Sequence, residues 1–421
     1  MDVDDLPNPK LRAGKTGEWE SLFPYYAGFS KNFADSVMLA CPESARQGVL
    51  DPWNGAGTTT LAAAQAGAAG VGVDINPVMN VVARARAVAR EDADILFPLG
   101  ELLAKSAERN CRTEEPLLDW FDRDSAREIR ALANSIRFNT TGGLARLGLA
   151  GRGEISGPTA VMYVALFSAC KGALAALRTS NPTWIRIPSC IEDKIHVDRE
   201  ELHASFLEAL ISATSHAFAH GLEEKQNTPE LIRGDASQNV AGKYGLILTS
   251  PPYCTRLDYA HLTRLELAVL DPYLAEGYTA FRRSFTGTTL TERAPPRRLP
   301  LLGDRCNRLL DAVRSHRSRA SAGYYYKSHV DYYNKMSRSL RSACRSLKLG
   351  GKLVLVIQDS WYKDVHNDVP AILSDFCERE GLSLIKRRDF PVDRSLADVH
   401  KHRADYKAGR PATEAVIVFE R

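Results

Sequence analysis

The stretch Gly48-Val-Leu-Asp-Pro-Trp-Asn-Gly-Ala-Gly-Thr-Thr-Thr60 decides the fold class. Val49 and Leu50 predict a short strand, and the Gly-rich turn after them leads into an Ala-rich helix. Gly70-Val-Gly-Val-Asp74 then predicts a second strand that ends in a carboxylate. An acid about 20 residues after a Gly-rich turn is typical of a nucleoside-binding βαβ unit, where it accepts hydrogen bonds from both ribose hydroxyls. The alternative is an ordinary βαβ unit with an incidental acid.

The turn itself indicates which ligand it would bind. Gly55 and Gly57 leave room for a ligand close to the backbone, and free amides at the helix start favour a negative group. The turn lacks the G-x-x-x-x-G-K-[ST] pattern of a triphosphate-binding loop. Asp51, at the strand end, would repel a pyrophosphate and attract a cationic amino-acid group. We therefore expect S-adenosyl-L-methionine rather than a dinucleotide.

A second stretch, Leu246-Ile-Leu-Thr-Ser250-Pro-Pro-Tyr253, predicts a buried strand that ends in a rigid loop. Pro251 and Pro252 fix their own φ and remove two backbone donors, which leaves carbonyl oxygens free. Ser250 adds a hydroxyl that can donate or accept, and Tyr253 adds an aromatic face. This set suits a planar group that carries an exocyclic amine. Pro-Pro-Tyr also occurs in partner-binding peptides and in plain turns, so its meaning depends on the upstream turn.

Length and composition limit the remaining possibilities. The 421 residues suffice for one large domain with insertions or for two domains, and a net charge of +4 gives no global signal for a polyanionic partner. The eight cysteines form no C-x-x-C pair and no His/Cys cluster, so we expect no metal site and a reducing, cytoplasmic setting. The acidic start lacks an apolar signal segment, and the apolar run 161–177 contains Lys171, so we expect a buried helix and no membrane span.

The rest of the chain predicts further strands and two insertions. Residues 231–235 predict a third strand ending in Asp235, which could receive an adenine amino group, and strands at 382–387 and 415–419 could pair antiparallel. We divide the chain into a sheet domain with cofactor-binding (1–91), catalytic-loop (229–280) and C-terminal (324–421) parts, a helical insertion (92–228) and a basic insertion (281–323).

The segment 282–341 is strongly basic, with fourteen Lys and Arg against four Asp and Glu. Cationic side chains interleaved with aromatic ones suit phosphate neutralisation and base stacking. The alternative is a merely solvated basic segment. The interleaved aromatic residues are Tyr324, Tyr325, Tyr326, Tyr332 and Tyr333.

With these pieces in order, the sequence resembles the DNA methyltransferases that use S-adenosyl-L-methionine to modify exocyclic amino groups, on cytosine-N4 or adenine-N6. Asp51-Pro-Trp-Asn-Gly-Ala-Gly-Thr-Thr matches the family's D-P-F-x-G-x-G-T motif, with Trp53 in place of Phe. Thr249-Ser-Pro-Pro-Tyr253 matches its catalytic [DNS]-P-P-[YFW] loop. Phe23-Pro-Tyr-Tyr-Ala-Gly-Phe29 is similar to its N-terminal cofactor motif, although a capped loop would give the same pattern.

The resemblance implies a doubly wound, seven-stranded class I methyltransferase sheet of the Rossmann-like kind, with recognition of the target in the insertions. It implies methylation of a base flipped out of double-stranded DNA, with Ser250 favouring cytosine-N4 over adenine-N6, and a restriction–modification nuclease or defence-system subunit as partner. The implied catalytic residues are Ser250, Pro251, Pro252 and Tyr253. The implied cofactor-binding residues are Phe23, Tyr25, Asp51, Trp53, Gly55, Gly57, Thr58, Thr59, Asp74, Ile75 and Asp235.

The catalytic loop suggests how such a reaction would proceed. An aromatic exocyclic amine is a poor nucleophile because its lone pair is delocalised into the ring. Ser250 and the Pro251 carbonyl can accept hydrogen bonds from the amine and aim its lone pair at the sulfonium methyl, so positioning replaces a Cys nucleophile such as Cys254. Tyr253 would stack on a base rotated out of the duplex.

Two other functions fit the same motifs. An RNA amino-methyltransferase would use the same catalytic loop, but the chain has no recognisable RNA-binding appendage. A non-catalytic subunit could bind the cofactor and lend its basic segment to a nucleic-acid complex. The intact set of Asp51, Asp74 and Ser250-Pro-Pro-Tyr253 argues against that reading, since a non-catalytic protein does not need all of them.

Overall fold

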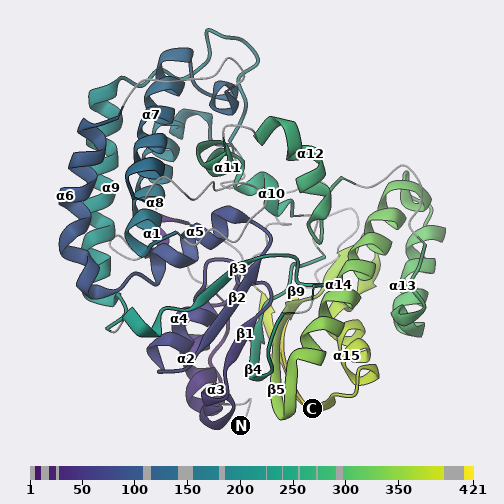
Figure 1. Cartoon of the computed structure of the whole chain (residues 1–421). Coiled ribbons are helices and arrows are strands. Elements are labelled where there is room, and N and C mark those ends of the chain that lie inside the picture. The colour runs from purple at the N-terminus through teal and green to yellow at the C-terminus, as the bar shows by residue number, and fades with distance from the viewer. Residues whose placement is uncertain are drawn as a thin grey trace.

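A twisted central sheet with helices on both faces, and a group of helices beside it, make up the computed structural model (Figure 1). The structure describes residues 5–10, 19–24, 28–107, 115–140, 155–179, 185–223, 225–238, 240–254, 257–271, 274–290, 297–392 and 412–421. The predicted α/β class with a seven-stranded, mostly parallel sheet is confirmed.

The strand order is β3-β2-β1-β4-β5-β9-β8. The chain moves outward from β1 in one direction through β2 and β3, and in the other through β4 and β5, so the order reverses between β1 and β4. In open α/β sheets such a reversal leaves a crevice at the carboxyl ends of the strands, where ligands bind. The first five strands are parallel: β1 (Val49–Asp51), β2 (Gly70–Asp74), β3 (Glu230–Arg233), β4 (Tyr244–Thr249) and β5 (Leu347–Gln358).

The last two strands of the sheet are antiparallel. Strand β9 (Ala412–Glu420) pairs with β5 on one side and with β8 (Ser383–Val392) on the other. The predicted antiparallel pairing of the final two strands is therefore confirmed. A separate hairpin, β6 (Ser360–Tyr362) with β7 (Val365–Asn367), follows β5 directly.

Both faces of the sheet are covered because successive side chains of a strand point to opposite sides. Ile247 of β4 packs into a core with α13 (Gly303–Ser315), α14 (Tyr326–Ser346) and α15 (Val369–Arg379). Leu246 and Leu248 enter a second core on the opposite face, built with α2 (Lys31–Ala40), α3 (Pro42–Arg46) and α4 (Thr58–Gln65).

The segment between β2 and β3 is helical, as its pattern predicts. Helix α8 (Gly157–Ala173), which covers most of the apolar run, is mostly buried among its neighbours. No helix of the described residues is long and apolar enough to cross a membrane. The other helices of this group are α1 (Trp19–Leu22), α5 (Pro77–Arg86), α6 (Ala93–Lys105), α7 (Arg123–Thr140) and α9 (Arg199–His220).

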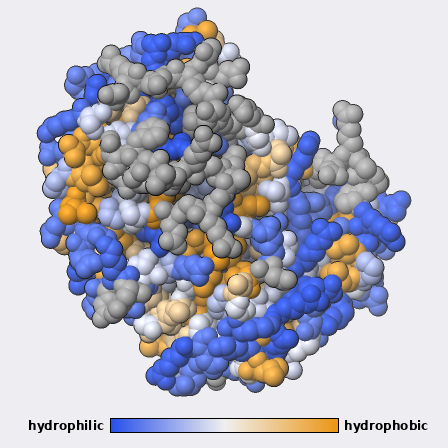
Figure 2. All heavy atoms as spheres, viewed as in Figure 1, coloured by the Kyte–Doolittle hydropathy of each residue, from blue (hydrophilic) through white to orange (hydrophobic). Residues whose placement is uncertain are grey.

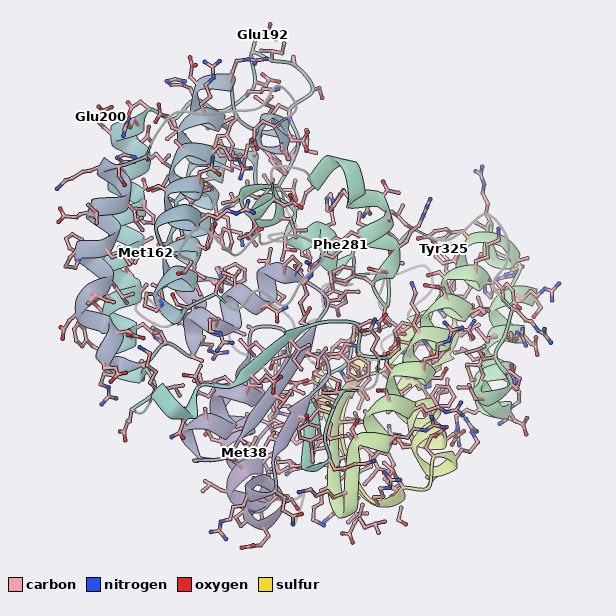
Figure 3. All side chains as sticks on the ribbon, viewed as in Figure 1. Met38, Met162, Glu192, Glu200, Phe281 and Tyr325 are labelled. Atoms are coloured by element: carbon pink, nitrogen blue, oxygen red, sulfur yellow. The ribbon has the colours of Figure 1, made fainter. Side chains whose placement is uncertain are left out.

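Three helices follow the Ser-Pro-Pro-Tyr loop; Phe281 lies on the last of them, and Tyr325 lies in the turn just before α14 (Figure 3). These helices are α10 (Tyr259–Leu262), α11 (Arg264–Leu270) and α12 (Leu274–Ser284). Single turns are η2 (Arg90–Asp92), η3 (Pro116–Asp119), η4 (Ala175–Leu177), η5 (Lys225–Asn227), η6 (Pro300–Leu302) and the π-helix η7 (Ser321–Tyr325).

The basic segment differs from its prediction in one respect. Tyr332 and Tyr333 are 1% and 0% exposed, so the hypothesis that they stack on bases is wrong. Helix α14 is amphipathic and turns both rings toward the sheet. Exposed cations remain on α13 and on the loop after it, where hydrophilic side chains predominate (Figure 2). They are Arg305, Arg308, Arg314, Arg317 and Arg319.

Candidate active site

The carboxyl ends of β1, β2 and β4 bring the predicted motifs together at the point where the strand order reverses. The Asn54 N–H donates to the Val73 carbonyl at 2.9 Å, which fixes the Gly-rich turn against β2. The Gly234 N–H donates to the Asp74 carbonyl at 3.1 Å, which adds the end of β3. Three stretches far apart in sequence therefore share one edge of the sheet.

Asp51 ties β1 to β4 and to the start of α4. Its Oδ1 accepts from the Thr249 hydroxyl at 2.6 Å and from the Trp53 N–H at 3.0 Å, and its Oδ2 accepts from the Thr59 hydroxyl at 2.6 Å. The side chain is 3% exposed, and burial raises the pKa of Asp51 to about 6. These contacts give Asp51 an internal bracing role, and its attraction for an ammonium group stays a prediction.

Asp74 clamps the turn from the neighbouring strand. Its Oδ2 accepts from the Gly55 N–H at 2.9 Å and its Oδ1 from the Asn76 N–H at 2.8 Å. Burial, and then the nearby charge of Asp51, raises the pKa of Asp74 to about 6. The side chain is only half-buried, as is that of Ile75, which packs against the core of the helical group. Asp74 is thus a carboxylate at the strand end with room for further donors.

The reason that the turn needs glycine differs from the one that the sequence suggests. Gly55 and Gly57 have φ of +48° and +78°, in the left-handed region that favours glycine. A Cβ on Gly57 would lie 2.7 Å from the Ala83 Cβ of α5. The explanation that a ligand takes this space at Gly57 is therefore wrong, because α5 already takes it.

Thr58 and Thr59, two predicted cofactor contacts, have internal partners. The Arg86 guanidinium donates to Thr58 Oγ1 at 2.9 Å. Thr59 is fully buried, and its hydroxyl lies 3.1 Å from the Leu248 carbonyl as well as against Asp51. Thr59 therefore supports the turn from behind, and a cofactor would meet the turn through its backbone.

The remaining predicted cofactor residues are spread more widely. Trp53 is half-buried against the same core as Tyr253. Asp235 lies just after β3, where its Oδ1 accepts from the Ser237 N–H at 2.8 Å. Phe23 is buried in the core of the helical group, with the Lys171 ammonium 4.4 Å from its ring centroid. Tyr25 lies outside the described residues.

Tyrosine side chains hold the Ser-Pro-Pro-Tyr loop in place. The Tyr332 hydroxyl donates to the Pro252 carbonyl at 2.8 Å, and the Tyr253 N–H donates to the Tyr259 hydroxyl at 3.2 Å. Within the described part of the chain, no group donates to the Pro251 carbonyl. The loop thus fixes the Pro252 carbonyl and the Tyr253 N–H, while Pro251 itself is buried beside them.

The Tyr253 hydroxyl faces the protein. It donates to Glu414 Oε1 of β9 at 2.6 Å and accepts from the Ser250 hydroxyl at 3.4 Å. Burial, and then the charge of Glu414, raises the pKa of Tyr253 well above its ordinary value, and burial also raises the pKa of Glu414. Burial raises the pKa of the neighbouring Cys254 thiol to about 12, so it stays protonated and is a poor nucleophile.

Sequence reasoning missed Tyr259, Tyr332 and Glu414 as parts of this site. Tyr259 and Tyr332 were visible only as aromatic residues in helical segments, with nothing to say which face each would occupy. Glu414 carried the clearer signal, since it is an acid in the otherwise apolar strand Ala412-Thr-Glu-Ala-Val-Ile-Val-Phe419. A buried carboxylate in such a strand needs a donor, and the structure shows that the donor is Tyr253.

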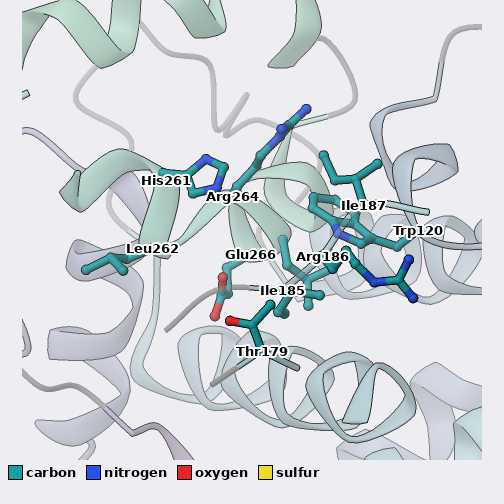
Figure 4. A pocket seen from close by; sticks show the side chains of 10 residues that line it. Trp120, Thr179, Ile185, Arg186, Ile187, His261, Leu262, Arg264 and Glu266 are labelled. Carbon is teal, nitrogen blue, oxygen red and sulfur yellow. The ribbon is translucent and has the colours of Figure 1, made fainter. Parts of the chain in front are cut away.

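A cavity of about 300 Å³, away from this site, lies between the helical group and α11 (Figure 4). None of the predicted catalytic or cofactor residues lines it. The buried Glu266 beside it forms an ion pair with Lys171, and the Arg264 guanidinium donates to Asp119 at 2.6 Å. The charged groups Glu266 and Arg264 therefore already have protein partners.

Among the residues that the structure describes, no three His, Cys, Asp or Glu side chains gather in a way that could hold a metal ion. A comparison with protein-family models finds none that matches this chain, and a comparison with curated proteins finds no match either.

Proposed function

We propose that this protein transfers a methyl group from S-adenosyl-L-methionine to the exocyclic amine of a flipped base in DNA, with cytosine-N4 favoured over adenine-N6. One observation carries the proposal. The Asp74–Gly55 clamp and the Ser-Pro-Pro-Tyr loop meet at the edge of the sheet where its strand order reverses. Methyl transfer requires the cofactor and the substrate amine to bind side by side, and the turn and the loop would bind one each in a shared crevice.

The residues present fit the cofactor. Asp74 offers carboxylate oxygens to ribose hydroxyls, and the left-handed turn at Gly55 and Gly57 leads directly into the start of α4. Trp53 would cover the methionine end and Asp235 would accept from the adenine amine. When bound, S-adenosyl-L-methionine supplies an electrophilic methyl group.

On the substrate side, the Pro251 carbonyl and the Ser250 hydroxyl accept hydrogen bonds from the amine. That arrangement draws the nitrogen lone pair out of the ring and directs it along the line of displacement. The half-buried Tyr253 ring offers a face for the flipped base. Exposed arginines of α13 and the loop after it would neutralise phosphates of the flanking duplex.

The setting of the proposed enzyme follows from the same reasoning. We place it in the cytoplasm, with a restriction nuclease or defence-system subunit as its partner, and assign recognition of the target sequence to residues 92–228 and 281–323. The same loop would serve an RNA amine, so an RNA methyltransferase is the second candidate.

Product analysis tests the proposal directly. The protein is incubated with labelled S-adenosyl-L-methionine and mixed DNA and RNA, which are digested to nucleosides for mass spectrometry. We expect label on cytosine-N4 of DNA and none with Ser250→Ala, which should still bind the cofactor. Label on adenine-N6 would change the base, label only in RNA would establish the second candidate, and no label with cofactor bound would refute the catalytic function.

A further inference from the structure

The hydroxyls of the catalytic loop form a hydrogen-bonded chain with a defined direction. Ser250 donates to the Tyr253 hydroxyl at 3.4 Å, and Tyr253 donates to Glu414 Oε1 at 2.6 Å. Ionised Glu414 can only accept, so the Tyr253 proton must point toward it. The Tyr253 oxygen is then left with its lone pairs for Ser250.

This direction decides what Ser250 can do toward a substrate. A serine hydroxyl has one proton, and the Tyr253 oxygen, 3.4 Å away, is the acceptor for it inside the loop. Its lone pairs are the groups that remain for a ligand in the loop. Ser250 is therefore set as an acceptor, which is the role that an amine N–H requires and which a freely rotating hydroxyl would fill only part of the time.

Burying the Glu414 carboxylate costs free energy, which indicates that this side chain has a role beyond packing. It is 8% exposed, in a strand whose neighbours Ala415, Val416 and Ile417 are fully buried. A buried carboxylate is expensive unless it is hydrogen-bonded, and a neutral residue would satisfy the strand at lower cost. Burial raises the pKa of Glu414, which makes it a better proton acceptor.

We propose that Glu414 is a positioning residue which acts through Tyr253 to hold Ser250 as an acceptor, and which finally receives the proton released from the substrate amine. This inference rests on the proposed methyl transfer. As the N–C bond forms, the C–S bond breaks and its electron pair stays on sulfur. The amine proton passes to Ser250 Oγ, the Ser250 proton to the Tyr253 oxygen, and the Tyr253 proton to Glu414, which becomes neutral.

A double-mutant cycle tests this relay in the full-length chain. Glu414→Gln, Tyr253→Phe and the double variant are compared with wild type for the single-turnover rate of methyl transfer to DNA and for affinity toward S-adenosyl-L-methionine. We expect each single variant to lose about 10- to 100-fold in rate, at the lower end of acid–base effects. Cofactor affinity should stay within about threefold, and the double variant should be no slower than Tyr253→Phe alone.

Glu420→Gln provides the matched control, because Glu420 lies on the same strand and pairs with Lys352 at 2.6 Å, away from the loop. It should retain the wild-type rate. Additive losses in the double variant would show that the two side chains act independently, which would overturn the relay while leaving the methyl transfer itself intact.

Two further outcomes are also decisive. A wild-type protein that labels neither DNA nor RNA overturns the proposed function, and the relay with it. If Glu414→Gln does not fold, Tyr253→Phe tests the same chain from its other end. A Tyr253→Phe rate within threefold of wild type would overturn the relay, and a tenfold or larger loss with unchanged cofactor affinity would support it.

Discussion

Replacing Gly57 by alanine, and Gly67 for comparison, should separate the free-energy cost of a left-handed backbone from that of a steric clash with α5. Gly57 has φ of +78°, and an added Cβ would lie 2.7 Å from the Ala83 Cβ and 3.1 Å from its Cα. Gly67, just past the other end of α4, has φ of +70° and nothing within 4 Å of an added Cβ. The two glycines share the backbone strain, and only Gly57 has the steric conflict.

The size of each effect follows from these geometries. A left-handed alanine costs about 1–2 kcal/mol, which is the whole effect expected for Gly67→Ala. Overpacking against a helix backbone adds about 1–3 kcal/mol, so Gly57→Ala should lose about 2–5 kcal/mol. The difference between the variants, about 1–3 kcal/mol, measures the contact between the turn and α5.

Urea denaturation followed by far-UV circular dichroism would compare both variants with wild type, and calorimetry would measure binding of S-adenosyl-L-methionine. We expect Gly57→Ala to weaken binding as well, because the turn must move away from α5. Equal destabilisation by the two substitutions would refute the steric argument and leave only the backbone conformation as the reason for glycine.

Three further predictions concern charge. Burial raises the pKa of Asp51 to about 6 against an ordinary 3.8, so the folded state favours the protonated acid. The contribution of Asp51 to stability is fully present below pH 4 and is lost as pH rises to 6, by up to about 3 kcal/mol. Asp51→Asn should remove this part of the fall in urea titrations from pH 4 to 7, while Asp74, whose pKa is raised in the same direction, keeps its own part. Arg130 pairs with the buried Glu115 at 2.7 Å and donates to the Val269 carbonyl, so Arg130→Met should cost about 3–5 kcal/mol of unfolding free energy. Arg308→Ala with Arg317→Ala should weaken DNA binding at all sequences and lower the salt slope of log K by about 2.

Each of these has its own control. An Asp51→Asn variant with an unchanged pH profile would show that Asp51 is not the titrating group. Adding Glu115→Gln to Arg130→Met should recover part of the loss, and a larger loss would contradict the account of an uncompensated charge. Arg46→Ala, on exposed α3, should leave the salt slope of DNA binding unchanged. An equal decrease with Arg46→Ala would refute the assignment of phosphate contacts to α13 and the loop after it.

Local signals predicted the edge of the sheet well. Apolar runs that end on special turn residues mark β1 and β4, because Asp51-Pro and Ser250-Pro-Pro cannot continue a strand. The acid of Gly70-Val-Gly-Val-Asp74 marks the end of β2 in the same way. Parallel strands then bring these ends together without further information, so the candidate site could be located from sequence even though its ligand stays a proposal.

Partners on distant elements could not be predicted. The sequence shows tyrosines among the cations of the basic segment but not which way they face. Tyr332 and Tyr333 lie on the buried face of α14, and only packing decides which face is buried. Asp51 was predicted to contact a ligand because its protein partners were not visible in the sequence. One of its three donors is Thr249, nearly two hundred residues away. Glu414 meets Tyr253 only because β9 inserts between β5 and β8.

That insertion also has a consequence for how the chain is made. Strand β9 is the last of the sheet to leave the ribosome, yet it occupies an interior place between β5 and β8. Until it arrives, β5 presents an unpaired hydrophobic edge, and such edges invite aggregation. The nascent chain therefore holds an incomplete sheet until residues 412–420 have emerged, and a chaperone that shields β5 during that interval should raise the yield of folded protein.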